Sequence, residues 1–388
     1  MAEPSLPLTG TRPARSLGGM LRYFLSLGAL GFGGPIALAG AMHRDLVETR
    51  GWISEADYQE GLTLAQLSPG PLAAQLAIYL GYVSGGILGA TLVGLVFILP
   101  SFLMVLGLAA LYLAFGGLWW MQAAFYGVGA AVIGLIARSA VKLAKSTLRR
   151  DPLAWGIFLV LTLTTAWTGR EWVSLILLGG FLSWLIKARP FRAGVAAGGL
   201  VPVWLLTGAQ GAAGAAGLLG ILAFFAKAGL FVFGSGLAIV PFLHHGVVIE
   251  HHWLTERQFL DAVAVAMITP GPVVITVAFI GYLVAGPLGA CAAAAGVFLP
   301  VYLVVILAAP FFRRYGQQPD LKAIVQGVTA GATGAIAGSV VVLGRGAIRD
   351  FPTTALALST LLLVWKTKVP EPLLVVGAGL AGLLVFKG

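Results

Sequence analysis

Apolar residues fall along the chain in long blocks separated by short polar stretches. Such blocks predict membrane helices, because a helix rises about 1.5 Å per residue and a bilayer core is about 30 Å thick. Several blocks are short for that thickness. We read two sets of six spans, at 21–41, 61–83, 87–114, 118–137, 152–168 and 171–186, and at 222–243, 260–283, 287–311, 321–343, 352–365 and 371–386.

The composition fits a chain embedded in lipid. Hydrophobic residues make up 59% of it and charged residues 10%, whereas a soluble domain carries about 25% charged residues. The 54 glycines allow close helix packing in a membrane. The expected fold class is therefore an all-α integral membrane protein with about 12–13 spans, counting an apolar stretch at 193–208.

Charge and cysteine content exclude several classes of function. The net charge is +10, but the basic residues are scattered over short loops, so no nucleic-acid partner is expected. The single cysteine, Cys291, excludes an intramolecular disulfide and argues against a cysteine metal cluster. No nucleotide-binding loop or catalytic constellation is visible, which predicts a protein that is neither an ATP-driven pump nor an enzyme, with no cofactor and no metal.

The two halves of the chain repeat each other. A shift of about 200 positions superimposes glycines, prolines, tryptophans and histidines over most of the length, which indicates a duplication. The clearest matches are Phe32-Gly33-Gly34 with Phe233-Gly234-Ser235, His43 with His244, Trp52 with Trp253, Glu55 with Glu256, and Pro69-Gly70-Pro71 with Pro270-Gly271-Pro272.

The apolar stretch at 193–208 predicts that the halves are inverted, because six crossings and a seventh start the second half on the opposite side. A cytoplasmic N-terminus puts all but seven of the 24 basic residues inside. The alternative is parallel halves with a surface connector. The seven that remain outside or embedded are Arg44, Arg50, Arg170, Lys227, Arg345, Arg349 and Lys387.

These observations divide the chain into four parts: a polar segment at 1–20, a first repeat at 21–192, a connecting segment at 193–210 and a second repeat at 211–388. The first apolar run begins at Leu21, so no cleavable signal peptide is expected. The C-terminus is expected in the periplasm.

Glycine and proline interrupt the first two spans of each half at matching places. Paired helix breaks of this kind point to a transporter binding site, because a new helix start exposes N–H groups that attract oxyanions. The alternative is that these residues only kink or pack helices. The candidate substrate-binding residues at the breaks are Gly33, Gly34, Pro35, Gln66, Ser68, Pro69, Gly70, Pro71, Gly234, Ser235, Gly236, Thr269, Pro270, Gly271 and Pro272.

A few ionisable residues stand out against this apolar background. Lys227 is alone in a long apolar run, so it is a candidate to attract an anion, with a lysine that reaches to the interface as the alternative. The stretches 43–60 and 244–261 look like interfacial helices with aromatic anchors. Candidates for gating or proton linkage are His43, Glu60, His244 and Asp261.

The residues around the breaks resemble the chromate ion transporter (CHR) superfamily in its long, two-domain form. The resemblance rests on the run from Phe32 to Pro35, the polar stretch ending at Trp52, the run from Gln66 to Pro71, and the following Gly81 and Pro100. The second half departs from the pattern, with Gly236 where the first half has Pro35.

The resemblance implies a carrier in the inner membrane of a bacterium or archaeon that exports chromate and confers resistance, with sulfate as a similar competitor. The alternatives are an uptake carrier for sulfate or a related oxyanion, a passive anion channel and a membrane scaffold without transport. The expected partners are the oxyanion and the lipid bilayer, and a homodimer is left open.

Overall fold

A computed structural model describes residues 16–32, 34–115, 118–169, 172–187, 217–230, 239–315, 318–348, 350–367 and 369–386. These residues form helices and connecting turns, with no strand among them. The connecting segment at 193–210 lies outside the described residues. In the first half the helices are α1 Leu17–Leu30, α2 Gly34–Met42, the π-helix η1 His43–Thr49, α3 Glu55–Leu67, α4 Leu72–Phe115, α5 Trp119–Leu148, α6 Pro152–Thr168 and α7 Val173–Lys187.

The second half follows the same order. Its helices are α8 Leu218–Leu230, α9 Val240–His244, the π-helix η5 His245–Glu250, α10 Glu256–Ile268, the 3-10 turn η6 Val273–Ile275, α11 Thr276–Tyr315, α12 Pro319–Ala347, α13 Phe351–Lys366 and α14 Glu371–Val385. Within the described residues, α4, α5, α11 and α12 are long and apolar enough to cross a membrane. The structure confirms an all-α membrane protein made of two related repeats.

The first predicted span, 21–41, does not run straight across. It breaks after α1, and α2 folds back, so that Trp52 reaches Gly19 and the Tyr23 hydroxyl donates to Asp45 at 3.3 Å near the start of α1. In the second half, Trp253 likewise packs against Phe224 of α8. The glycines at the break provide the physical reason, since they permit a reversal that a continuous helix cannot make.

The second predicted span of each half is also a hairpin. The helices α3 and the first arm of α4, 72–84, are joined by a short turn, and Gly61 packs against the Tyr79 ring. The backbone then reverses at Gly86, where φ is +61°, so that Gly81 packs against Gly89 of the second arm, 87–115. We call α3 with the first arm of α4 hairpin 1. Its counterpart, α10 with residues 273–284, is hairpin 2. The backbone reverses after it at Gly286, and Gly281 packs against Gly289.

The two hairpins enter from opposite ends of the second arm of α4. Hairpin 1 has its base near the start of this arm, where Gly81 packs against Gly89. Hairpin 2 has its base near the end of the arm, where the Tyr112 hydroxyl donates to Asp261 at 2.7 Å. Between these points, Ser101 lies against Gly271 at the turn of hairpin 2. Hairpins that enter from opposite ends and meet at their turns are the arrangement of inverted repeats.

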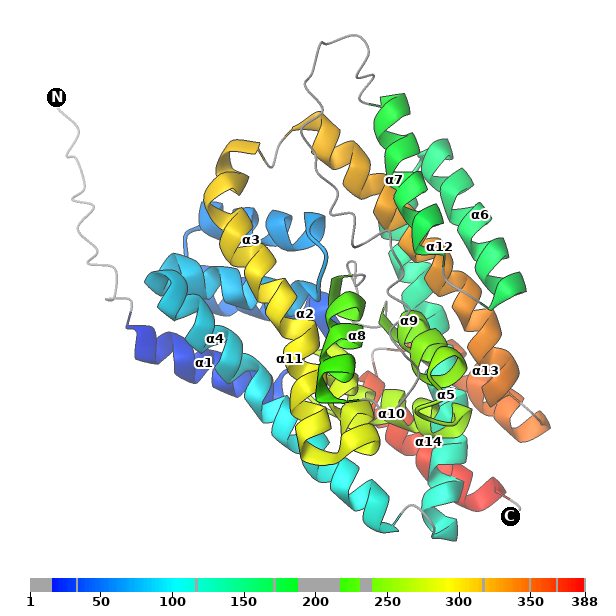
Figure 1. Cartoon of the computed structure of the whole chain (residues 1–388). Helices are drawn as coiled ribbons and strands as arrows, with labels where there is room; N and C mark the ends of the chain where they lie inside the picture. Colours follow the sequence, from blue (N-terminus) through cyan, green and yellow to red (C-terminus); the bar gives the residue numbers. More distant parts are fainter. Residues whose placement is uncertain are drawn as a thin grey trace, which may run out of the picture.

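The outer helices of the two repeats are exchanged. Helices α6 and α7 pack on α12 of the second repeat, and α13 and α14 pack on α5 of the first. In Figure 1, α6, α7 and α13 lie on the right of the view, away from α1 on the left. Glycines permit the close approach: Gly127 meets the backbone of Ala378, and Gly334 meets that of Phe158.

Matched polar contacts lie at the ends of these exchanged helices. Asp151 caps α6 and accepts from Gln326 of α12 at 3.1 Å, while Asp350 caps α13 and accepts from the Tyr126 hydroxyl of α5. Gln326 and Tyr126 hold the same position in their repeats. Each repeat therefore anchors the outer helices of the other.

Candidate functional site

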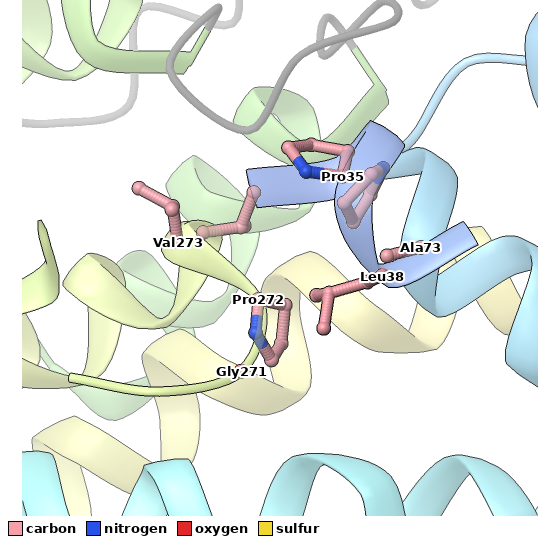
Figure 2. Close-up of a pocket in the computed structure, with 8 residues that line it drawn as sticks. Pro35, Leu38, Ala73, Gly271, Pro272 and Val273 are labelled. Carbon is pink, nitrogen blue, oxygen red and sulfur yellow. The ribbon is translucent and has the colours of Figure 1, made fainter. Parts of the chain in front are cut away.

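Three helix starts meet at one pocket where the turns of the hairpins come together. The pocket lies between α2, the start of α4 and the turn of hairpin 2, and Figure 2 shows Pro35 and Leu38 facing Gly271 and Pro272 across it. Both repeats therefore contribute to the same site. The lining residues are Pro35, Leu38, Pro71, Ala73, Gly271, Pro272, Val273 and Val274.

Among the described residues, those that line this pocket are proline, glycine or aliphatic. The polarity of this part of the lining therefore comes from backbone groups and not from charged side chains. The first N–H groups of a helix have no partner within the helix, and the helix dipole adds partial positive charge at the same end. Ala73 lies in the first turn of α4, and Val273 and Val274 begin the helical run into α11. Such a pocket suits a small anion.

A backbone hydrogen bond joins the two repeats at this pocket. The Gly271 N–H donates to the Gly31 carbonyl at 2.8 Å, which fixes the turn of hairpin 2 on the break of α1. Gly271 has a φ of +94°, and a Cβ built on it would overlap the Ser101 hydroxyl. Glycine is therefore required there for both its backbone conformation and its lack of a side chain.

Donors from other segments neutralise the carbonyl end of α1. Its last carbonyls would place partial negative charge beside an anion site. The buried Ser101 hydroxyl donates to the Gly28 carbonyl at 3.1 Å, and Gly271 occupies the Gly31 carbonyl. The site thus presents helix starts beside a helix end at which the Gly28 and Gly31 carbonyls are hydrogen-bonded. Sequence reasoning missed Ser101, because nothing local distinguishes this serine in an apolar run.

The second repeat treats the same position differently. Val301 stands where Ser101 stands in the first repeat, and its methyl group packs against Gly70 at the turn of hairpin 1. Valine has no hydroxyl to donate, and Lys227 instead provides a cation in the last turn of α8. A lysine near a helix C-terminus counters the negative end of the dipole. The two repeats are therefore not equivalent in their electrostatics.

Gln75 braces the turn of hairpin 1. Its buried amide nitrogen donates to the Ser68 hydroxyl at 3.0 Å and to the Pro69 carbonyl at 2.7 Å. Its Oε1 atom has no donor within the described part of the chain, and a buried acceptor of this kind is costly unless something bonds to it. Sequence reasoning missed Gln75 because it lies after the Pro-Gly-Pro motif, where the repeat alignment shifts.

The structure brings together only part of the predicted substrate site. Pro35, Pro71, Gly271 and Pro272 line the pocket, whereas Lys227 does not. Other candidates support the turns: the Ser68 and Thr269 hydroxyls donate to the carbonyls of Leu64 and Val265, and Gly34, Pro69, Gly70 and Pro270 shape the backbone. Gln66 is exposed on α3. Gly33, Gly234, Ser235 and Gly236 lie outside the described residues.

The stretches read as interfacial helices have another form. In each repeat a short π-helix is followed by a sharp turn and then by the first turn of a hairpin, so 43–60 and 244–261 are not continuous helices. Their tryptophans pack back onto α1 and α8. The amphipathic pattern arose because the folded segment has one buried side, which includes Leu46, Ile53 and Tyr58 in the first repeat, and one polar side.

The titratable candidates lie away from the pocket. His43 pairs with Glu55 at 2.8 Å, and His244 pairs with Glu256 at 2.7 Å, at the bases of the hairpins. Asp261 is buried beneath the Tyr112 hydroxyl, and Glu60 is half-buried on α3. Within the described part of the chain, no group of three or more such residues could hold a metal ion.

Comparisons with known proteins agree with the repeat. The chromate transporter family model matches residues 19–184 and again 219–383. The chain is 58% identical over 380 residues to the chromate transport protein of Cupriavidus metallidurans, which spans 97% of this chain and 95% of the relative. It is 56% identical to the probable chromate transport protein of Synechococcus elongatus, over 98% of both chains. It is 33% identical to the chromate transport protein of Pseudomonas aeruginosa, over 96% of this chain and 94% of the relative. No solved structure matches.

The chain consists of two related helical repeats, and their hairpins meet at a shared pocket. This architecture is that of a multi-pass membrane transporter. The family model covers most of the chain in two copies, and two relatives match nearly its full length. The chain belongs to the chromate transporter family, and this membership places it among transporters rather than enzymes.

Proposed function

We propose that this protein exports chromate from the cytoplasm through the inner membrane, driven by the membrane potential, and thereby confers chromate resistance. The observation that carries the proposal is the pocket where three helix starts from both repeats converge. A tetrahedral oxyanion offers several acceptors to such N–H groups. The names of the relatives support chromate as the substrate.

Everted membrane vesicles test the substrate and the direction together. Vesicles from cells that make the protein should accumulate labelled chromate in a saturable manner. The cytoplasmic face of an everted vesicle points outward, so an exporter moves chromate into the vesicle. Vesicles carrying the empty vector are the control, and unlabelled sulfate measures competition. Accumulation of sulfate without chromate would contradict the proposal and favour a sulfate carrier, while flux that never saturates would favour a channel.

Lys227 is proposed as a charge that draws the anion toward the pocket from the second repeat. It lies in the last turn of α8 and is half-buried, and its counterpart in the first repeat is Ser26. At this position, therefore, only the second repeat attracts the anion with a positive charge. The amides of the first turn of α4 are proposed to complete the substrate contacts on the side of hairpin 1, while Ser68 and Gln75 hold the turn that precedes them.

The topology proposed is a cytoplasmic N-terminus and a periplasmic C-terminus. The fold strengthens the charge argument, because α2 folds back and brings Arg44 and Arg50 to the end of the molecule where α1 begins. Arg257 lies at the opposite end, where its guanidinium donates to the Gln122 carbonyl at 3.1 Å. Arg44 and Arg50 thus join the basic residues on the cytoplasmic side, and Arg257 moves to the periplasmic side. The excess of basic residues on the cytoplasmic side increases.

Reporter fusions check this topology. A reporter active only in the periplasm should be active when fused after residue 388, and one active only in the cytoplasm should be active before residue 17. A cytoplasmic reporter fused after residue 187 should also be active, because α4, α5, α6 and α7 together return the chain to its starting side. Activity of the cytoplasmic reporter at residue 388 would contradict inverted halves.

A further inference from the structure

A histidine–carboxylate pair occurs at the same place in both repeats. His43 at the start of η1 pairs with Glu55, the first residue of α3, at 2.8 Å. His244 at the end of α9 pairs with Glu256, the first residue of α10, at 2.7 Å. The aromatic partners also correspond, since the His43 ring meets Tyr58 and the His244 ring meets Phe259, edge to face in both cases.

Each pair joins two segments that the chain itself connects through a short turn. In the first repeat the segments are the fold-back helix α2 with η1, and hairpin 1. In the second they are α9 with η5, and hairpin 2. Because the hairpins enter from opposite ends of α4, the two pairs lie at opposite ends of the molecule. Each pair is thus placed to control one side of the pocket.

The first repeat has two further links that depend on side chains which differ in the second. Glu48 also contacts His43, at 3.1 Å, where the second repeat has Ile249. The Tyr58 hydroxyl donates to the Ala39 carbonyl of α2 at 2.9 Å, whereas Phe259 has no hydroxyl. Hydrogen bonds from Gln59 and His43 hold the pKa of Glu55 below its usual range, so this carboxylate stays charged.

We propose that His43 with Glu55 and His244 with Glu256 are latches that position the pocket, each making the fold-back helix and the hairpin of one repeat move as a unit during transport. The inference rests on the proposed transport function. The histidines are positioning residues, because neither is among the residues that line the pocket. The second latch carries more of the load, since it lacks the Glu48 and Tyr58 links and its histidine is only 6% exposed.

Turnover and affinity distinguish a latch from a simple packing contact. His244→Leu should lower chromate turnover about tenfold with KM changed less than about twofold, because a hydrogen bond to a charged group is lost but the pocket is intact. His43→Leu should lower turnover only about threefold, because the Tyr58 link remains. Exchanging the partners, as His244→Glu with Glu256→His, should restore most of the turnover. Unchanged turnover in His244→Leu, or a loss seen only in KM, would overturn the proposal.

Cross-linking tests movement as a unit and keeps the proposal falsifiable if a histidine variant folds poorly. In a Cys291→Ser background, the pair His43→Cys and Glu55→Cys is bridged with a short bifunctional thiosulfonate. Transport should persist at no less than about half its unbridged rate, since a covalent bridge replaces a link that is kept throughout the cycle. Transport that stops on bridging and returns on reduction would overturn the proposal.

A matched bridge gives the opposite expectation. The pair Tyr112→Cys and Asp261→Cys joins hairpin 2 to α4 of the other repeat, so bridging it should stop transport. The unbridged forms of both pairs show whether the chain transports chromate at all, which separates failure of the latch from failure of the proposed function. Hydrogen exchange adds a readout without substrate: the first turn of α10 should exchange faster in His244→Leu and return to the wild-type rate in the exchanged pair.

Discussion

Chromate transport by the purified protein will accelerate when a valinomycin-set potassium potential makes the chromate-loaded side negative. Moving one charge through 100 mV is worth about 2.3 kcal/mol. A dianion crossing roughly 150 mV therefore gains about 7 kcal/mol in the outward direction, and at about 1.4 kcal/mol per tenfold ratio this corresponds to roughly five decades of concentration. Export of the dianion thus needs neither ATP nor an obligatory proton.

The described part of the fold agrees with this mechanism. The pocket is lined by apolar residues and helix starts, and no chain of carboxylates leads to it through the described residues. The buried carboxylate of Asp261 sits at the base of hairpin 2, bonded to Tyr112. Proteoliposomes at equal pH on both sides, with the potential as the variable, make the measurement. Liposomes with valinomycin but no protein are the control. Transport that ignores the potential and follows only a pH gradient would contradict the mechanism.

Replacing Gly271 with valine will abolish transport while leaving folded protein in the membrane. Any side chain at this position overlaps the Ser101 hydroxyl and forces a φ of +94° on a residue that disfavours it. The turn of hairpin 2 must then shift, and its hydrogen bond to the Gly31 carbonyl is lost. Misplacement of a site by about 1 Å costs on the order of 100-fold in rate, so we expect at least that loss. Gly271→Ala should show the same defect in milder form.

Two further variants separate this effect from general strain. Gly286 also has a positive φ, +63°, but no atom lies within 4 Å of a Cβ built there. Gly286→Ala therefore carries a backbone cost of about 1–3 kcal/mol away from the pocket and should transport normally. Adding Ser101→Gly to Gly271→Ala removes the overlapping hydroxyl and should recover part of the activity. Labelled chromate uptake is compared at equal amounts of monodisperse protein. Wild-type rates in Gly271→Val would mean that the turn only packs helices.

The sequence correctly predicted features that depend on one stretch of chain at a time. Apolar blocks indicated membrane helices because lipid demands long apolar surfaces, and the glycine and proline motifs marked where those helices break. The internal repeat was visible because both copies kept their special backbone residues. His43 and His244 stood out because they occupied the same place in both halves. Each of these signals is local, or is the same local signal seen twice.

Only the tertiary structure decided how these pieces meet. The first span of each half folds back, the second is a hairpin, and the outer helices pack on the opposite repeat, since close approach between glycines decides such contacts at long range. Ser101 satisfies the Gly28 carbonyl, and Gln75 braces a turn that precedes it. Their roles depend on partners that no sequence pattern identifies. The sequence by itself determined that the chain consists of two related sets of membrane helices and where those helices break. The packing of the two inverted repeats determined which breaks form one site.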